Sequence, residues 1–130
     1  MKLDEVMTTP QDLIRAYVAG ALDVCCIKIA RVGGLTKARR MRDLCCDLGL
    51  AVVANDVRGS DITTAALTHF ASSTPTRNVL ATTDLTDYVT VSLAEGCPRP
   101  RDGCISASKA PGLGVVPAMD VLGPPVAEIT

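Results

Sequence analysis

Short apolar runs alternate with amphipathic segments along the first ninety residues of the chain. The runs are of strand length and bounded by turn residues, which predicts buried strands over residues 2–6, 23–29, 50–54 and 78–81. The segments between them repeat apolar residues at helical spacing, which predicts helices over residues 11–18, 35–48 and 61–71. Strands and helices therefore alternate regularly.

Local signals support these boundaries. Thr9 followed by Pro10 is typical of a helix start, and Gly20 and Gly49 follow the first two predicted helices, where glycine commonly ends a helix. The second predicted helix carries four basic side chains that we expect to form one solvated face: Lys37, Arg39, Arg40 and Arg42.

The runs recur roughly every 25 residues, the length of a strand, a helix and two loops. This series belongs to the α/β class and requires a parallel sheet with helical crossovers. Prolines and glycines crowd the last part of the chain and predict an irregular segment with a short hairpin around Asp102-Gly103. We therefore expect an α/β unit over residues 1–91 and a Pro/Gly-rich tail of the same domain over 92–130.

Composition narrows the class of protein. The 130 residues are 48% apolar, with only two Tyr, one Phe and no Trp, which suits a single domain with an aliphatic core. Thirteen basic and fourteen acidic residues argue against nucleic acid or an anionic membrane as a partner. The six cysteines include no C-x-x-C pair, which leaves no usable spacing for zinc. The adjacent pairs Cys25-Cys26 and Cys45-Cys46 lie in apolar runs, which indicates buried or half-buried thiols in a reducing compartment; the alternative is a redox or disulfide role. With no signal peptide or membrane span expected, we predict a cytoplasmic protein.

Polar groups fall at the carboxyl ends of all four runs: Asp4-Glu5, Lys28, Asn55-Asp56 and Thr82-Thr83-Asp84. In parallel α/β folds these ends and the loops after them form the ligand-binding edge. The pattern therefore indicates a binding site there. The alternative is that the strands simply end in polar loops.

Lys28 differs from the other polar groups because it lies inside a run, between Ile27 and Ile29. Burial lowers the pKa of a lysine and makes it a candidate general base, whereas an acidic partner raises that pKa again. The alternative is an edge lysine whose amine reaches water. Asp4 could hold Mg²⁺ through oxygen, but neighbours on a strand point to opposite faces, so Asp4 and Glu5 should not both face one metal.

Four motifs together carry a family resemblance: Leu3-Asp4-Glu5, Ile27-Lys28-Ile29 followed by Gly33-Gly34, Gly59-Ser60-Asp61-Ile62, and Pro111-Gly112-Leu113-Gly114. In this order they resemble the C-terminal half of the mandelate racemase and muconate lactonizing enzyme family, a branch of the enolase superfamily. The resemblance covers nearly the whole chain. Within the family it is greatest to the cis-3-hydroxy-L-proline dehydratases and the proline-betaine 2-epimerases.

The resemblance implies a partial (β/α)₈ barrel, strands five to eight with their helices, in a Mg²⁺-dependent dehydratase, racemase or epimerase. Its substrate would be a small amino or hydroxy carboxylate, such as a hydroxyproline, and the full-length form would be a homo-oligomer. By position, the implied roles are metal ligand for Asp4, supporting acidic residue for Glu5, acid/base group for Lys28, and substrate contacts for Asp56, Thr82 and Thr83.

The chain also departs from the family pattern. It has no counterpart of the second, third and fourth barrel strands, which in the family bring the opposing lysine and two more metal carboxylates, so we expect it to be inactive alone. Arg58 stands where related sequences often have Trp, which replaces an aromatic wall with a charge.

Two other functions remain open. One is a non-catalytic half-barrel that pairs with itself or complements another chain, because truncation leaves strand edges exposed. The other is a different α/β half-barrel or a small doubly wound domain with another ligand at the same edge.

Overall fold

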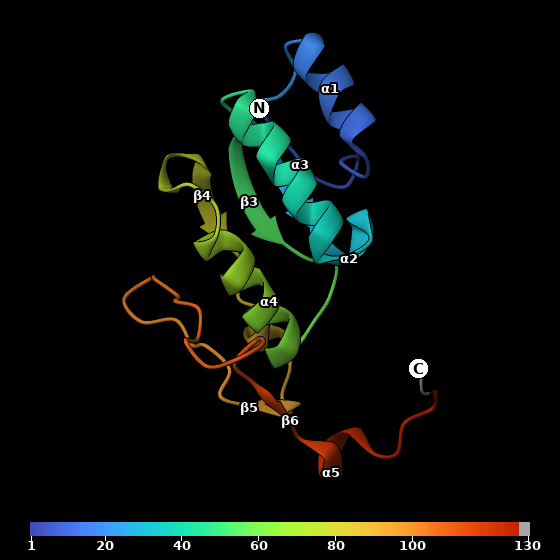
Figure 1. Ribbon diagram of the computed structural model, residues 1–130, viewed down its shortest axis with the longest axis vertical. Coiled ribbons are helices and arrows are strands. Elements are labelled where there is room, and N and C mark those ends of the chain that lie inside the picture. Colours follow the sequence, from blue (N-terminus) through green and yellow to red (C-terminus); the bar gives the residue numbers. More distant parts are fainter. Residues whose placement is uncertain (128–130) are drawn as a thin grey trace.

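A four-stranded parallel sheet organises the computed structural model, which describes residues 1–127 (Figure 1). Its strands, in spatial and chain order, are β1 (Lys2–Leu3), β2 (Val24–Lys28), β3 (Ala51–Asn55) and β4 (Val79–Thr82). The predicted α/β class and parallel sheet are confirmed. The first strand is shorter than predicted, because the chain leaves the sheet after Leu3 and turns at Asp4, whose carbonyl accepts the Met7 N–H at 2.9 Å.

Helices connect successive strands: α1 (Pro10–Val18), α2 (Ile29–Val32), α3 (Leu35–Asp47) and α4 (Asp61–Ser72). The helix start at Thr9 is confirmed by a reciprocal cap, in which Thr9 Oγ1 accepts the Asp12 N–H at 3.2 Å and Asp12 Oδ2 accepts the Thr9 N–H at 2.9 Å. The sequence did not predict α2. The run was expected to continue as a strand through Ile29, but the chain turns directly after Lys28.

The hydrophobic core lies between the sheet and the helices on one face. Alternate strand residues point to this face, and they join helix residues in one cluster whose largest members include Leu13, Ile27, Met41, Val52, Leu67 and Phe70. Figure 1 shows α3 and α4 lying across the same face of the sheet. Lys28 and Asn55, one strand position along from core members, therefore belong to the opposite face.

The basic face predicted for the second helix is wrong at one position. Arg42 is buried, with Nη1 donating to the carbonyl and the hydroxyl of Ser73 at 2.9 Å each. Its guanidinium carbon lies 5.8 Å from the centre of the Phe70 ring. Arg42 thus connects α3 to α4, while Lys37, Arg39 and Arg40 are exposed as expected.

The C-terminal segment extends past α4 and away from the sheet (Figure 1). It contains short elements that the sequence did not predict: a 3₁₀ turn over Thr86–Tyr88, the antiparallel pair β5 (Ala94–Glu95) and β6 (Val116–Pro117), and α5 (Met119–Leu122). Another unpredicted 3₁₀ turn, Thr76–Asn78, joins α4 to β4. The hairpin at Asp102-Gly103 is confirmed, because Arg101 and Cys104 exchange both backbone hydrogen bonds. The domain boundary near residue 92 stays a prediction.

Two buried or half-buried side chains hold this segment on α4. Asp61, which is fully buried, accepts the Leu93 N–H at 2.8 Å and an Arg99 N–H at 3.0 Å. His69 Nε2 lies 3.2 Å from the carbonyl oxygen of Leu113, so this histidine serves packing rather than the strand-end site.

The two adjacent cysteine pairs have the buried or half-buried environments expected of them: Cys25, Cys26 and Cys45 are buried and Cys46 is half-buried. Cys97 is half-buried, Cys104 is exposed, and all six cysteines are free. Among residues 1–127, none of the helices has the length and apolar character needed to cross a membrane.

Candidate functional site

Lys28 forms the centre of a charged cluster at the carboxyl end of β2. Its side chain is only 9% exposed, and Nζ donates a hydrogen bond to Glu5 Oε1 at 2.6 Å and lies 3.1 Å from Asp4 Oδ1. Because β2 is flanked by β1 and β3, the alternative of an edge lysine that reaches water is wrong. Burial of a lysine among apolar strands requires such acidic partners.

Asp4 and Glu5 both approach Lys28, although alternation along a strand predicts opposite directions. The expectation is wrong because β1 ends at Leu3, so the two carboxylates lie in the turn that follows. Arg31, on α2, adds a fourth charge: it donates to the Glu5 carbonyl oxygen at 3.4 Å and lies 3.9 Å from Glu5 Oε1.

These contacts determine the charge of the lysine. The hydrogen bond that Lys28 donates to Glu5 raises the pKa of Lys28, burial opposes this, and Asp4 raises it further, so the net pKa is above its usual value. Burial by itself would raise the pKa of Asp4, but the contacts with Glu5 and Lys28 outweigh it and the net pKa is lowered. In this arrangement the cluster holds an ammonium and two carboxylates.

One oxygen of this cluster fits a metal ligand. Asp4 Oδ1 is buried and has no hydrogen-bond partner among the described residues, although Lys28 Nζ lies nearby, so it retains lone pairs for a cation. Within residues 1–127, however, no group of three His, Cys, Asp or Glu side chains could hold a metal. Asp4 therefore fits as one ligand of Mg²⁺ and not as a complete site.

Asp56, at the end of β3, is buried and committed to backbone groups. Its two oxygens lie 3.2 and 3.1 Å from the Ala30 nitrogen, and Oδ1 accepts the Val57 N–H at 2.7 Å. Ala30 lies two residues after Lys28, so the carboxylate ties the end of β3 to the first turn of α2. This contact also explains why the chain turns after Lys28 instead of continuing as a strand.

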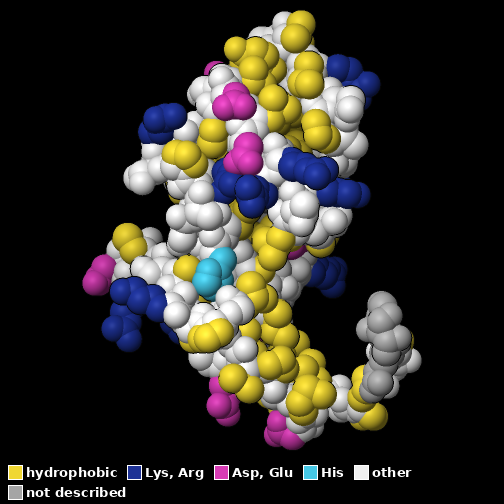
Figure 2. Space-filling view, in the orientation of Figure 1, with side chains coloured by type: hydrophobic (Ala, Val, Ile, Leu, Met, Phe, Trp, Pro, Cys, Tyr) yellow, Lys and Arg dark blue, Asp and Glu magenta, His cyan; other side chains and the backbone are white. Residues whose placement is uncertain are grey.

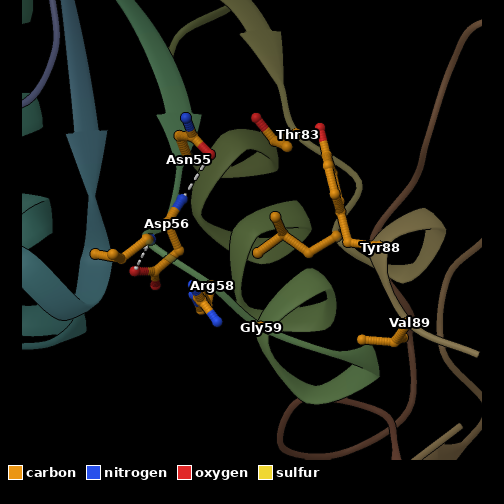
Figure 3. Close-up of a pocket in the computed structure, with 9 residues that line it drawn as sticks. Asn55, Asp56, Arg58, Gly59, Thr83, Tyr88 and Val89 are labelled. Atoms are coloured by element: carbon orange, nitrogen blue, oxygen red, sulfur yellow. Dashed lines mark hydrogen bonds between the residues drawn. The ribbon is translucent and has the colours of Figure 1, made fainter. Parts of the chain in front are cut away.

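A cavity of about 650 Å³ opens at the carboxyl ends of β3 and β4 (Figure 3). Its lining comprises Asn55, Asp56, Val57, Arg58, Gly59, Thr83, Leu85, Tyr88 and Val89. Asn55 pairs with Lys28 across β2 and β3, so the cavity begins one strand away from the charged cluster. Sequence patterns missed Leu85, Tyr88 and Val89, because the 3₁₀ turn that brings them here has no periodic signal.

The two threonines at the end of β4, Thr82 and Thr83, occupy different environments. Thr83 lines the cavity and its N–H donates to the Ala54 carbonyl oxygen at 3.0 Å. Thr82 pairs with Ala54, a core residue, and its hydroxyl is buried without a hydrogen-bond partner in the described structure. Figure 3 shows Asn55, Thr83 and Tyr88 around the upper part of the opening and Arg58 below them. Of the two hydroxyls, that of Thr83 is the better placed for a ligand.

Comparison with known proteins identifies relatives of this chain that belong to one enzyme superfamily. The family model described as enolase C-terminal domain-like matches residues 2–121. The chain is 47% identical over 126 residues to the cis-3-hydroxy-L-proline dehydratase of Roseibium aggregatum, covering 97% of this chain and 34% of that protein. It is 32% identical over 121 residues to muconate cycloisomerase 1 of Rhodococcus opacus, covering 92% of this chain and 32% of that protein.

Solved structures agree with the sequence relatives. A mandelate racemase/muconate lactonizing enzyme from Roseovarius nubinhibens superimposes with a TM-score of 0.93 at 45% identity, over 98% of this chain and 34% of that one. Another from the same organism, complexed with magnesium, gives 0.92 at 36% identity, over 97% and 34%. The expected partial barrel is confirmed, and the chain spans about a third of the length of these relatives.

Proposed function

Because this chain belongs to the enolase C-terminal domain-like family, we propose that it forms the C-terminal part of a Mg²⁺-dependent enzyme that acts on the α-proton of a small carboxylate. The observation that carries this proposal is the buried Lys28 ammonium held between two carboxylates at the ligand-binding edge of the sheet. The reaction would be a dehydration, racemisation or epimerisation, the kinds of reaction that proton abstraction next to a carboxylate makes accessible.

Lys28 would be the group that holds and moves the proton. With Glu5 hydrogen bonded to Nζ, Lys28 carries a proton and is ready to donate it. To accept a proton, Lys28 must first be neutral, so its contact with Glu5 has to weaken when substrate is bound. Glu5 would thus influence which protonation state of Lys28 is present, without itself touching the reacting carbon.

Mg²⁺ would be held by Asp4 together with carboxylates from the remainder of a complete enzyme. A divalent cation on a substrate carboxylate stabilises the enediolate that forms when the α-proton leaves. Asp4 Oδ1 has no hydrogen-bond partner among the described residues and pairs with the Lys28 ammonium at 3.1 Å, which leaves a lone pair for a cation and supports this assignment. Because the described residues contain no complete metal site, we expect the chain alone to bind Mg²⁺ weakly and to turn over little or no substrate.

The substrate class follows from the relatives and from the cavity. A relative named cis-3-hydroxy-L-proline dehydratase shares 47% identity, which favours a cyclic hydroxy amino acid. The cavity beside Lys28 would receive the part of the substrate remote from its carboxylate, with Thr83 as a contact. Thr82 and Asp56 remain candidate contacts, with less support because Thr82 does not line the cavity and Asp56 is engaged with backbone N–H groups.

A chimera tests the proposal. The matching third of the Roseibium aggregatum dehydratase is replaced by this chain, and exchange of the substrate α-proton with solvent deuterium is followed by NMR together with loss of water. We expect the chimera to be active, Lys28→Ala to abolish exchange, and Arg39→Ala, which removes an exposed charge on α3, to leave exchange unchanged. A folded, active chimera that keeps normal exchange after Lys28→Ala would contradict the role of Lys28.

Exposed side chains on β4 favour a second candidate function, a half-barrel that pairs with another copy of itself. Leu80 is 59% exposed and Ala81 is also exposed, on a strand whose far edge is unpaired in the described structure. Sedimentation velocity separates the two functions: a stable dimer that is lost with Leu80→Lys supports self-pairing, whereas a cooperatively folded monomer argues against it.

A further inference from the structure

A second cavity, of about 530 Å³, lies between the start of α1 and the α2–α3 segment. Its lining comprises Thr8, Thr9, Pro10 and Gln11 from the first segment, and Arg31, Val32, Gly33, Lys37, Arg40 and Met41 from the second. It shares no residue with the cavity at the ends of β3 and β4. We propose that it binds a small organic anion, with a phosphate or similar doubly charged group attached to an apolar body.

The charge of the lining is uniformly positive. Arg31, Lys37 and Arg40 contribute three cations, and no carboxylate belongs to the lining. Among the described residues, Lys37 and Arg40 have no acidic partner within 4.0 Å, although Arg39 on the same helix pairs with Asp43 at 3.8 Å. Figure 2 shows Lys and Arg side chains gathered over the part of the molecule where α3 lies. Uncompensated cations around one cavity favour an anionic ligand.

The acidic residue on the α1 side does not neutralise these cations. Asp12 Oδ2 accepts the hydroxyl hydrogens of Thr8 and Thr9 at 2.7 Å each, and the carboxylate also pairs with Arg15. The Asp12 carboxylate is thus occupied by the N-terminal cap of α1 and by Arg15 on the same helix.

The position of Lys37 supports binding inside the cavity rather than at its surface. A β-carbon added to Gly33 would lie 3.1 Å from Lys37 Nζ, which shows that the amine folds back over Gly33. Pro10, which is exposed, provides apolar surface in the lining, above the nearly buried Val32 and Met41. This combination matches an anionic headgroup with an apolar substituent.

Arg31 connects the cavity with the charged cluster at Lys28. Besides lining the cavity, it contacts the Glu5 carbonyl oxygen and lies 3.9 Å from Glu5 Oε1. A bound anion would compete with Glu5 for this guanidinium, which prefers bidentate contacts with phosphate or carboxylate.

Titration calorimetry with inorganic phosphate and with phenyl phosphate tests the proposal on the 130-residue chain in low salt. We expect saturable binding of both, with phenyl phosphate several-fold tighter because its ring can contact Pro10. Lys37→Gln and Arg40→Gln should each weaken binding about five-fold, and 0.5 M NaCl should weaken it further. Glutamine preserves helix propensity, and circular dichroism confirms that each variant is folded.

Arg39→Gln is the matched control, because it removes one charge from the same helix outside this cavity. Equal weakening by Arg39→Gln and Lys37→Gln would show nonspecific attraction to a basic helix and would overturn the proposal. Absence of saturable binding by a folded chain would overturn it as well, and so would equal affinity for phosphate before and after Lys37→Gln.

Discussion

The carboxylate of Asp56 holds the backbone nitrogen of Ala30, with its two oxygens at 3.1 and 3.2 Å. The contact joins the end of β3 to the first turn of α2, two residues after Lys28. It fixes the backbone from which the lysine projects, although Asp56 and Lys28 themselves form no ion pair in the described structure. We therefore propose that Asp56 positions Lys28 through this backbone contact.

Substitution of Asp56 should loosen α2. Asp56→Ala removes the charged acceptor of two part-buried backbone N–H groups, those of Ala30 and Val57, which should lower the free energy of unfolding by about 1–3 kcal/mol. Asp56→Asn keeps one acceptor oxygen and should lose less. Urea unfolding measures the stability, and amide hydrogen exchange at Ala30 shows whether the loss is local. Unchanged exchange at Ala30 in Asp56→Ala would contradict the positioning role.

Removal of the Lys28 charge should destabilise the turn after β1. Lys28→Met keeps the aliphatic stem but leaves Asp4 and Glu5 close together without their cation, which should cost about 1–3 kcal/mol. The cost stays below that of a fully buried pair, because the Glu5 side chain is 60% exposed and can turn toward water. Lys37→Met, at an exposed position of α3, should change the unfolding free energy by less than about 0.5 kcal/mol in the same urea titration.

The attachment of the C-terminal segment should depend on pH through Asp61. Burial alone would raise the pKa of Asp61, but the Leu93 N–H and the Arg99 charge are among the contacts that outweigh it, so the folded-state pKa is below the usual value. A carboxyl group whose pKa is lower in the folded state stabilises the fold at pH values above its unfolded-state pKa of about 3.9. This stabilisation is lost as the pH falls through the folded-state pKa.

Asp61→Asn isolates this contribution. The difference in unfolding free energy between the unchanged chain and Asp61→Asn should be largest near pH 6–7 and should shrink below about pH 4. Urea titrations followed by circular dichroism at several pH values measure it. A difference that stays constant across this range would mean that the Asp61 carboxyl titrates alike in folded and unfolded states.

Arg42 should contribute to stability where its neighbour on the helix does not. Arg42→Met leaves the Ser73 carbonyl and hydroxyl without their donor and removes the guanidinium near Phe70, so we expect a loss of about 1–3 kcal/mol. Arg39→Met removes an exposed side chain whose pairing with Asp43 contributes under about 1 kcal/mol. Similar thermal midpoints for the two variants would contradict the structural role of Arg42.

The cysteines should react in the order of their exposure. Burial raises the pKa of the Cys26 thiol to about 11, so little thiolate forms near pH 8, whereas Cys104 is exposed. Iodoacetamide at pH 8 followed by peptide mass spectrometry should therefore label Cys104 first. Cys25, Cys26 and Cys45 should be labelled only when the chain unfolds in urea. Early labelling of Cys26 in the folded chain would show that the strand face around it opens.

The order of strands and helices could be predicted from the sequence because apolar periodicity is a local property. The strand runs, the cap at Thr9 and the hairpin at Asp102-Gly103 each depend on residues within a few positions of one another. The candidate site residues at the strand ends could be singled out for a related reason, since a lysine between Ile27 and Ile29 is unusual wherever the strand lies.

The sequence by itself thus determined the α/β series and the family resemblance, and it singled out Lys28 as a candidate. The tertiary structure decided the partners: Glu5 and Asp4 for Lys28, Ser73 for Arg42, and the Ala30 N–H for Asp56. These contacts join residues from 23 to 31 positions apart, so no local pattern encodes them. They form only when the sheet brings successive strand ends to one edge, where burial makes each unpaired polar group costly.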